Sequence, residues 1–125
     1  MATVKEVAEM LRKPKGRVRN VASKADRTYN GHVYHSKAEA LWAFQLDCQK
    51  QAGVIRSWRA QPKFTIWWPE GNAKICDVIL DFEVQNLDNT FKLQEIKGWE
   101  TPEWKLKKKL LLACYPDLRL EVIRA

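Results

Sequence analysis

Apolar residues recur at helical spacing over two long stretches of the chain and alternate with polar residues over several shorter ones. One helix is expected from Ser36, a good N-cap, to about Ala52, and another from about Pro102 to Cys114. The first of these has apolar side chains on two faces, so we expect it to be well buried. The two faces are Leu41, Phe44 and Cys48, and Trp42, Ala43 and Leu46. A capping box and apolar spacing also predict a short helix over residues 4–12.

Strand-like runs lie between the two long helices. Tight turns separate most of them, so an antiparallel meander is the natural arrangement. The runs are Val54–Arg59, Lys63–Trp68, Ala73–Gln85 and Thr90–Lys97, with a brief extended piece at His32–His35 and a last strand at Leu118–Ile123. The order helix, strands, helix, strand predicts an α/β fold in which helices flank a mixed sheet.

The net charge of the chain indicates what kind of molecule it could bind. The 125 residues are 46% hydrophobic, enough for one compact core, and carry a formal net charge of +7. Basic residues cluster between Arg12 and Arg27 with almost no apolar periodicity, so we expect a basic arm there. We therefore divide the chain into an N-terminal helix and arm (1–28) and one domain (29–125). Clustered Lys and Arg favour nucleic acid as the partner, although a solvated basic surface is the simpler alternative.

Several other classes of protein are disfavoured. Cys48, Cys76 and Cys114 lie far apart without zinc-ligand spacing, so reduced core thiols are expected. His32 and His35 lack a third nitrogen or thiolate ligand nearby, which favours a structural or DNA-facing role. No stretch is long and apolar enough to cross a membrane, and the charged N-terminus does not resemble a signal peptide. We expect a cytoplasmic protein with no membrane partner.

Two neighbouring strands carry the candidate chemistry. Because side chains alternate along a strand, Glu95 and Lys97 share a face with Phe91 and Leu93, which indicates an inner face that runs from core into a polar cleft. On the preceding strand the same alternation groups Ile75, Asp77, Ile79, Asp81 and Glu83. Asp81 and Glu95 would then approach each other, and paired carboxylates are hard oxygen ligands that suit Mg²⁺ or Mn²⁺. The alternative is a surface salt bridge between Glu95 and Lys97.

The order of these motifs resembles the PD-(D/E)XK nuclease superfamily, and in particular phage-encoded members related to Holliday-junction resolvases. The resemblance covers roughly residues 28–125. It rests on the segments Tyr29–Gly31, Ser36–Ala40, Gln61–Phe64, Asp81–Phe82, Glu95–Gly98 and Trp104–Lys107. Leu80 stands where the superfamily's name has proline, which makes the resemblance less specific.

The resemblance implies a restriction-endonuclease-like core with a metal-dependent active site. Residue by residue, it implies that Asp81 and Glu95 bind Mg²⁺, with Mn²⁺ as a substitute, and that Lys97 is the catalytic lysine. It also implies that Glu39 is an additional catalytic and metal-binding carboxylate. A capping box with Ser36 is an alternative role for Glu39 that needs no metal.

The expected activity is therefore hydrolysis of phosphodiester bonds in branched DNA, of the Holliday junction resolvase type used in DNA recombination, in the host cytoplasm if the gene is phage-encoded. Symmetric cutting of a four-way junction implies a homodimer. The alternatives are a nuclease of the same fold acting on linear or single-stranded DNA, and a DNA-binding protein without catalysis. Expected DNA contacts are Lys15, Arg17, Arg19, Gln61, Lys105, Lys108 and Lys109. Trp99 and Trp104 are either buried or available to stack at a junction.

Overall fold

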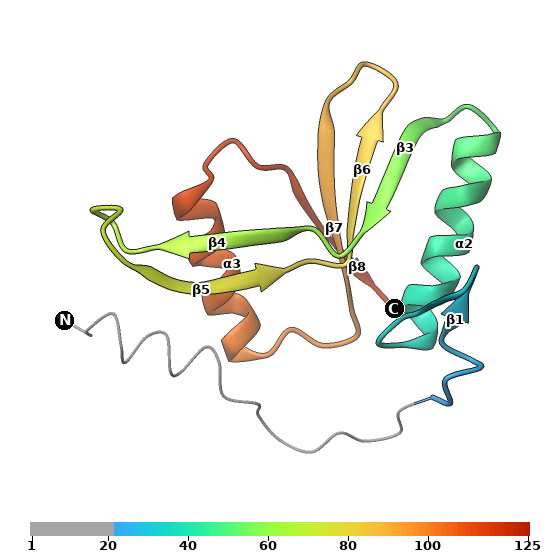
Figure 1. Cartoon of the computed structure of the whole chain (residues 1–125), viewed down its shortest axis with the longest axis horizontal. Coiled ribbons are helices and arrows are strands. Elements are labelled where there is room, and N and C mark those ends of the chain that lie inside the picture. The colour runs from blue at the N-terminus through green and yellow to red at the C-terminus, as the bar shows by residue number, and fades with distance from the viewer. Residues whose placement is uncertain (1–21) are drawn as a thin grey trace.

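The structure is a computed structural model that describes residues 22–125. In this range the elements are β1 (Thr28–Tyr29), β2 (His32–Val33), α2 (Lys37–Gln51), β3 (Ile55–Ala60), β4 (Lys63–Trp67), β5 (Lys74–Ile79), β6 (Phe82–Asn86), β7 (Phe91–Lys97), α3 (Pro102–Cys114) and β8 (Leu120–Arg124). The expected α/β class with a mixed sheet is confirmed (Figure 1). The helix expected over 4–12, and the arm as far as residue 21, lie outside the described residues.

Both long helices begin where the sequence predicts, because each has a side chain that caps its first turn. Ser36 Oγ accepts a hydrogen bond from the backbone N–H of Glu39 over 3.1 Å, and Thr101 Oγ1 accepts one from the N–H of Trp104 over 3.1 Å. Pro102 follows Thr101 at the start of α3, where a missing N–H costs nothing. The predicted bounds of both helices are confirmed to within about one residue.

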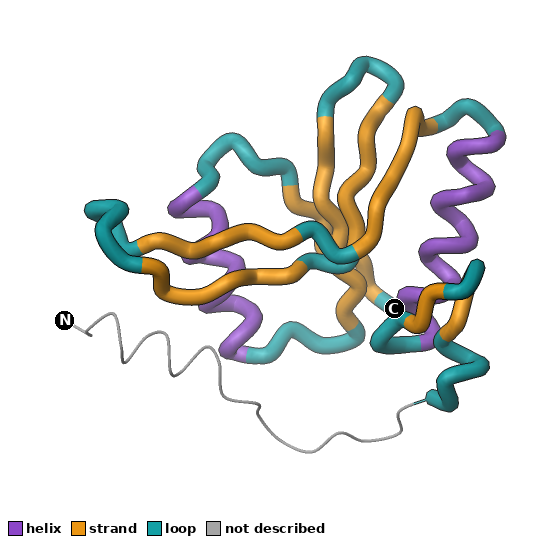
Figure 2. Tube along the Cα trace, viewed as in Figure 1, coloured by secondary structure: helices purple, strands orange, loops and turns teal. Residues whose placement is uncertain are grey.

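A four-stranded mixed sheet, in the order β3-β6-β7-β8, forms the centre of the molecule. β6 is antiparallel to β3 and to β7, whereas β8 is parallel to β7. A parallel neighbour requires a crossover connection, and α3 supplies it. Figure 2 shows the strands gathered in the middle, with α2 on one side and α3 on the other.

The simple meander is wrong, because β4 and β5 leave the four-stranded sheet and form a two-stranded ladder of their own. Pairing is nevertheless continuous across the change of direction. The N–H of Gln61 donates to the carbonyl of Asp81 over 2.9 Å, and the N–H of Leu80 donates to the carbonyl of Pro62 over 3.0 Å. The run predicted as one strand, Ala73–Gln85, is therefore β5 and β6 joined through a bend at Leu80 and Asp81.

The backbone is strained in the link between β3 and β4, which is hydrogen-bonded to this bend. Gln61 has φ 57°, in the left-handed region that non-glycine residues rarely adopt, and it directly precedes Pro62. We expect Gln61→Val to lower the free energy of unfolding by about 2 kcal/mol, because a β-branched side chain fits this conformation worst. Gln61→Gly should change it by less than about 1 kcal/mol. Urea denaturation of both variants tests this, and equal stability of the two would show that the bend holds no strain.

The core consists of two clusters of buried side chains, one against each helix. Between α3, the β4–β5 ladder and β7 the buried residues are Ile66, Ile75, Cys76, Val78, Leu80, Leu93, Trp104 and Leu111. Between α2, β3 and β6 they are Tyr34, Ala40, Ala43, Leu46, Ile55, Phe82 and Val84. Asp47 on α2 joins the second cluster to the β1–β2 hairpin, since it accepts hydrogen bonds from Tyr29 Oη over 2.6 Å and from Trp58 Nε1 over 2.8 Å.

Only one of the two apolar faces expected on α2 is covered in the structure. Ala43 and Leu46 are fully buried, but Leu41 is 54% exposed and Phe44 is 51% exposed. Cys48 on the same outer face is also exposed, so the expectation of a core thiol is wrong there, while Cys76 is buried. The helix packs on the sheet with one face, while the other face is half-exposed and meets Tyr29, whose ring lies edge-on to that of Phe44 with 5.8 Å between the ring centres. No helix in this range is long and apolar enough to cross a membrane.

Candidate active site

Asp81, just before β6, and Glu95, on β7, lie together on the two inner strands of the four-stranded sheet. Because Phe82 of β6 pairs with Gln94 of β7, the preceding residue Asp81 falls opposite Glu95. The backbone N–H of Asp81 donates to Glu95 Oε1 over 3.0 Å, and the N–H of Ile96 donates to Asp81 Oδ2 over 2.7 Å. Each carboxylate is thus held by a backbone donor from the opposite strand, which fixes both side chains on one side of the sheet.

This proximity changes the protonation of Glu95. Its side chain is buried, with 5% of the residue exposed. Burial raises the pKa of Glu95 to about 8, helped by a side-chain hydrogen bond with Asp81 and by repulsion from its charge, while Lys97 opposes the rise. The buried Glu95 carboxyl therefore keeps its proton to a higher pH than an exposed glutamate does.

Lys97 completes the group predicted from the sequence. Its Nζ lies 3.6 Å from Glu95 Oε2 and 4.8 Å from the centre of the Trp104 ring. The Lys97 side chain is 31% exposed and that of Glu95 6%, so the ion pair lies at the mouth of a cleft. The alternative of an ordinary surface salt bridge does not describe a pair whose acid is buried.

Glu39 approaches the same place from α2. Its side chain is buried, and burial followed by repulsion from Asp81 raises its pKa, against the attraction of His35. Glu39 Oε2 accepts a hydrogen bond from the backbone N–H of His35 over 3.3 Å. The Ser36 half of the predicted capping box is present, but the Glu39 carboxylate bonds to the residue before the cap.

Two small clefts open on either side of the carboxylate pair. The Glu95 cleft, of about 200 Å³, is lined by Val78, Ile79, Glu95, Lys97, Thr101, Glu103, Trp104 and Lys107. The Asp81 cleft, of about 190 Å³, is lined by His35, Gln61, Ile79, Leu80 and Asp81. Gln61, expected from the sequence as a DNA contact, therefore lies beside Asp81 in this cleft together with His35.

The predicted alternation of side chains before Asp81 is only partly right. Ile75 is buried in the core, but Ile79 is 56% exposed, so the two do not share one inner face. A register shift beside Trp67 and the bend at Leu80 each break the period of two. The bend, which the uniform strand in the prediction did not contain, lies just before β6, and the register of β6 on β7 places Asp81 opposite Glu95.

The lysines of α3 point in different directions. Lys105 and Lys109 are exposed, whereas Lys108 is half-buried and its Nζ donates to Glu100 Oε1 over 3.0 Å. Lys107, which the sequence analysis did not select, lines the Glu95 cleft. Its position three residues after Trp104 and six after the N-cap Thr101 was the available signal. Of the two tryptophans, Trp104 is buried and Trp99 is 74% exposed.

Glu100 holds the segment between Lys97 and α3 in place. Its carboxylate accepts hydrogen bonds from Trp104 Nε1 over 3.0 Å, from Lys108 Nζ over 3.0 Å and from Arg124 Nη2 over 3.3 Å. The hydrogen bond from Lys108 is the first cause of a lowered pKa at Glu100. Glu100 thereby connects α3 to the end of β8, next to the candidate active site.

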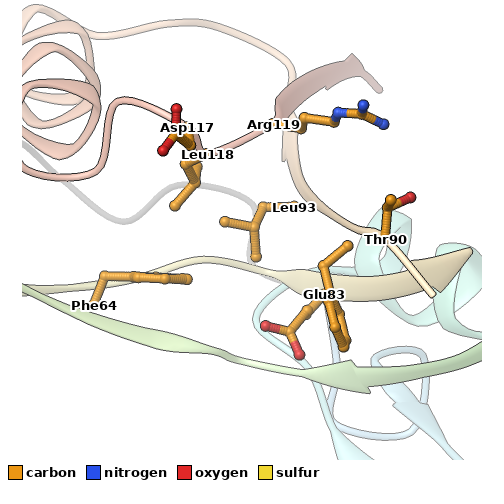
Figure 3. Close-up of a pocket in the computed structure, with 8 residues that line it drawn as sticks. Phe64, Glu83, Thr90, Leu93, Asp117, Leu118 and Arg119 are labelled. Atoms are coloured by element: carbon orange, nitrogen blue, oxygen red, sulfur yellow. The ribbon is translucent and has the colours of Figure 1, made fainter.

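A larger pocket lies elsewhere. It has a volume of about 470 Å³ and contains none of Glu39, Asp81, Glu95 and Lys97. Figure 3 shows its apolar side chains Phe64, Leu93 and Leu118, with Glu83, Asp117 and Arg119 around them. Pocket size alone would therefore direct attention away from the carboxylates.

The donor set suits a divalent cation in part. Asp81 and Glu95 offer carboxylate oxygens close together, and a cation would relieve the repulsion that raises the pKa of Glu95. Within residues 22–125 no group of three or more His, Cys, Asp or Glu side chains is arranged to hold a metal ion. Mg²⁺ commonly binds through one or two carboxylates and keeps several waters, so two protein ligands fit it. Glu39 as a third ligand stays a prediction.

The arm residues predicted to contact DNA, Lys15, Arg17 and Arg19, lie outside the described residues. The described residues form an α/β protein with a polar site where Asp81, beside β6, meets the buried Glu95 of β7. Residues 19–125 match the family described as "Protein of unknown function (DUF1064)", and the chain belongs to this family. No curated protein and no solved structure matches the chain.

Proposed function

We propose that the protein is a divalent-metal-dependent endonuclease that hydrolyses phosphodiester bonds in DNA. The observation that carries the proposal is the crossed hydrogen bonding of Asp81 and Glu95, which holds two carboxylates together beside the Lys97 amine. Acids placed so close raise each other's energy unless a proton or a cation lies between them. Such an arrangement destabilises the fold, so it is more typical of a binding or catalytic site than of a structural one.

In the proposed reaction, water attacks phosphorus and the bond from phosphorus to one bridging oxygen breaks, with a proton passing to that oxygen. Asp81 and Glu95 would hold Mg²⁺, or Mn²⁺ in its place, which supplies an activated water and balances charge on the phosphate. The ammonium group of Lys97 stabilises the negative charge that grows on the phosphate oxygens. Trp104, beneath the Lys97 amine, keeps that group directed into the cleft.

The proposed substrate is branched DNA, such as a four-way junction. The resemblance to resolvase-like nucleases in the order of motifs supports this class, and the net charge of +7 supports a polyanionic substrate. Two symmetric cuts in a junction require two active sites, so the protein would act as a homodimer. The basic arm would track phosphates outside the cleft.

One cleavage assay tests the proposal. Purified protein is incubated with a labelled four-way junction, a linear duplex and a single strand of matched sequence, in Mg²⁺ or in excess chelator. We expect the junction to be cut only with Mg²⁺, and faster than the duplex. Equal cutting of both DNAs would favour a nuclease of linear DNA, cutting of single strands alone a single-strand nuclease, and binding without cleavage a DNA-binding protein.

A further inference from the structure

We infer that Lys107 is a substrate-binding residue of the Glu95 cleft and contacts a phosphate of the bound DNA strand. The inference rests on the proposed nuclease function and extends it to a residue that lies in the Trp104–Lys107 motif but is not among the DNA contacts expected from the sequence. Lys107 is set apart from the other lysines of α3 by its place in the cleft that contains Glu95 and Lys97. Lys105 and Lys109 are exposed and do not line the cleft, and Lys108 is paired with Glu100.

The helix fixes where the Lys107 side chain can reach. Thr101, Trp104 and Lys107 recur every three residues and all line the cleft, so this side of α3 forms one of its walls. Trp104 is 4% exposed and anchors that wall in the core. Lys107 is half-buried where it lines the cleft, and a lysine so placed can pack its apolar stem on the wall while its amine reaches toward the opening.

The charged side chains that line the cleft indicate that Lys107 binds a phosphate. Two acids and two amines line it, and one amine, Lys97, already lies 3.6 Å from the Glu95 carboxylate. A DNA strand entering the cleft brings consecutive phosphates, so one beside the carboxylate pair and its neighbour need separate positive groups. Lys97 serves the first, and Lys107, from a different element, serves the neighbour. Lysine suits this purpose because it acts as a point charge on phosphate.

A contact to a neighbouring phosphate is made equally before and during the reaction, so its loss weakens binding and leaves the chemical step unchanged. The test compares Lys107→Gln with Lys50→Gln, since Lys50 is exposed in the last turn of α2, about 16 Å along the helix axis from Glu39. For Lys107→Gln we expect KM to rise about tenfold with kcat retained. Lys107→Arg should restore most of the affinity, and Lys50→Gln should match the wild type.

DNA binding without metal gives a second measurement that does not depend on cleavage. Fluorescence anisotropy at several salt concentrations should show the slope of log Kd against log salt reduced by about 0.9 in Lys107→Gln, the value for one lost phosphate contact. Circular dichroism confirms that each variant is folded. If the wild type cuts DNA but Lys107→Gln keeps its KM and salt slope, the inference is overturned and the nuclease stands.

The same measurements reveal a failure of the proposed nuclease function. If the wild type binds DNA without cutting it, and Lys107→Gln still lowers the salt slope, the proposed nuclease function fails while the phosphate contact is retained. A wild type that neither binds nor cuts DNA overturns both. A fall in kcat with unchanged KM would also contradict the inference, because it would place Lys107 in the chemical step.

Discussion

Asp81→Asn is expected to abolish Mg²⁺-dependent DNA cleavage, with a loss on the order of 1,000-fold in rate. The substitution removes the negative charge that would hold the cation and keeps an oxygen that can accept the hydrogen bond from Ile96. The protein should therefore fold as before and bind DNA in the absence of metal at least as tightly, since a repulsive charge is gone. Cleavage rates under single-turnover conditions, together with metal-free binding, test this.

Asp77→Asn is the matched control for that experiment. Asp77 lies on β5, where its carboxylate accepts hydrogen bonds from Thr65 over 2.8 Å and from Lys74 over 2.8 Å, and it lines neither cleft. We expect this variant to cut DNA at the wild-type rate. Retained cutting by Asp81→Asn, or an equal loss in both variants, would remove Asp81 from the site.

The second large effect concerns stability and pH. An unfolded chain releases the Glu95 proton near pH 4.5, whereas the folded protein keeps it until its pKa of about 8. Between these values the folded state binds more protons, so the free energy of unfolding falls as pH rises, and the fall is complete above pH 8. We expect a contribution on the order of a few kcal/mol from Glu95, measurable by urea denaturation from pH 4 to pH 9 without metal.

Glu95→Gln serves as the comparison, because an amide keeps a hydrogen-bond acceptor for the N–H of Asp81 and carries no charge. Its unfolding free energy should vary less with pH, and it should exceed that of the wild type above pH 8. A divalent cation should stabilise the wild type at high pH and have little effect on the variant. Identical pH profiles for the two proteins would mean that folding does not raise the pKa of Glu95.

Local signals in the sequence were sufficient for much of this structure. Ser36, Thr101 and Pro102 mark helix starts through contacts within one turn, so those bounds could be predicted closely. The prediction that Asp81 and Glu95 meet is also confirmed, because adjacent antiparallel strands with a short turn have few available registers. Lys97 follows from Glu95 by simple alternation.

Features that depend on distant parts of the chain were missed. The bend at Leu80 and Asp81 is hydrogen-bonded to Gln61, twenty residues earlier, and nothing in the local sequence of Gln61 demands its left-handed conformation. The outer face of α2 looked as apolar as the inner one, yet only tertiary packing decides which is covered. Lys107 differs from its neighbouring lysines only in the direction of its side chain, which depends on how α3 packs.

The three hydrogen bonds to Glu100 hold the link between Lys97 and α3 in place before any substrate binds. Only three residues separate Lys97 from the N-cap of α3, and the last of them, Glu100, is tied both to the helix and to the last strand. The amine and the cleft wall are thus set during folding, so little conformational entropy remains to be lost when a ligand arrives. Preorganisation of this kind lets affinity and rate depend on charge and shape in the cleft, without a separate closing motion of this link.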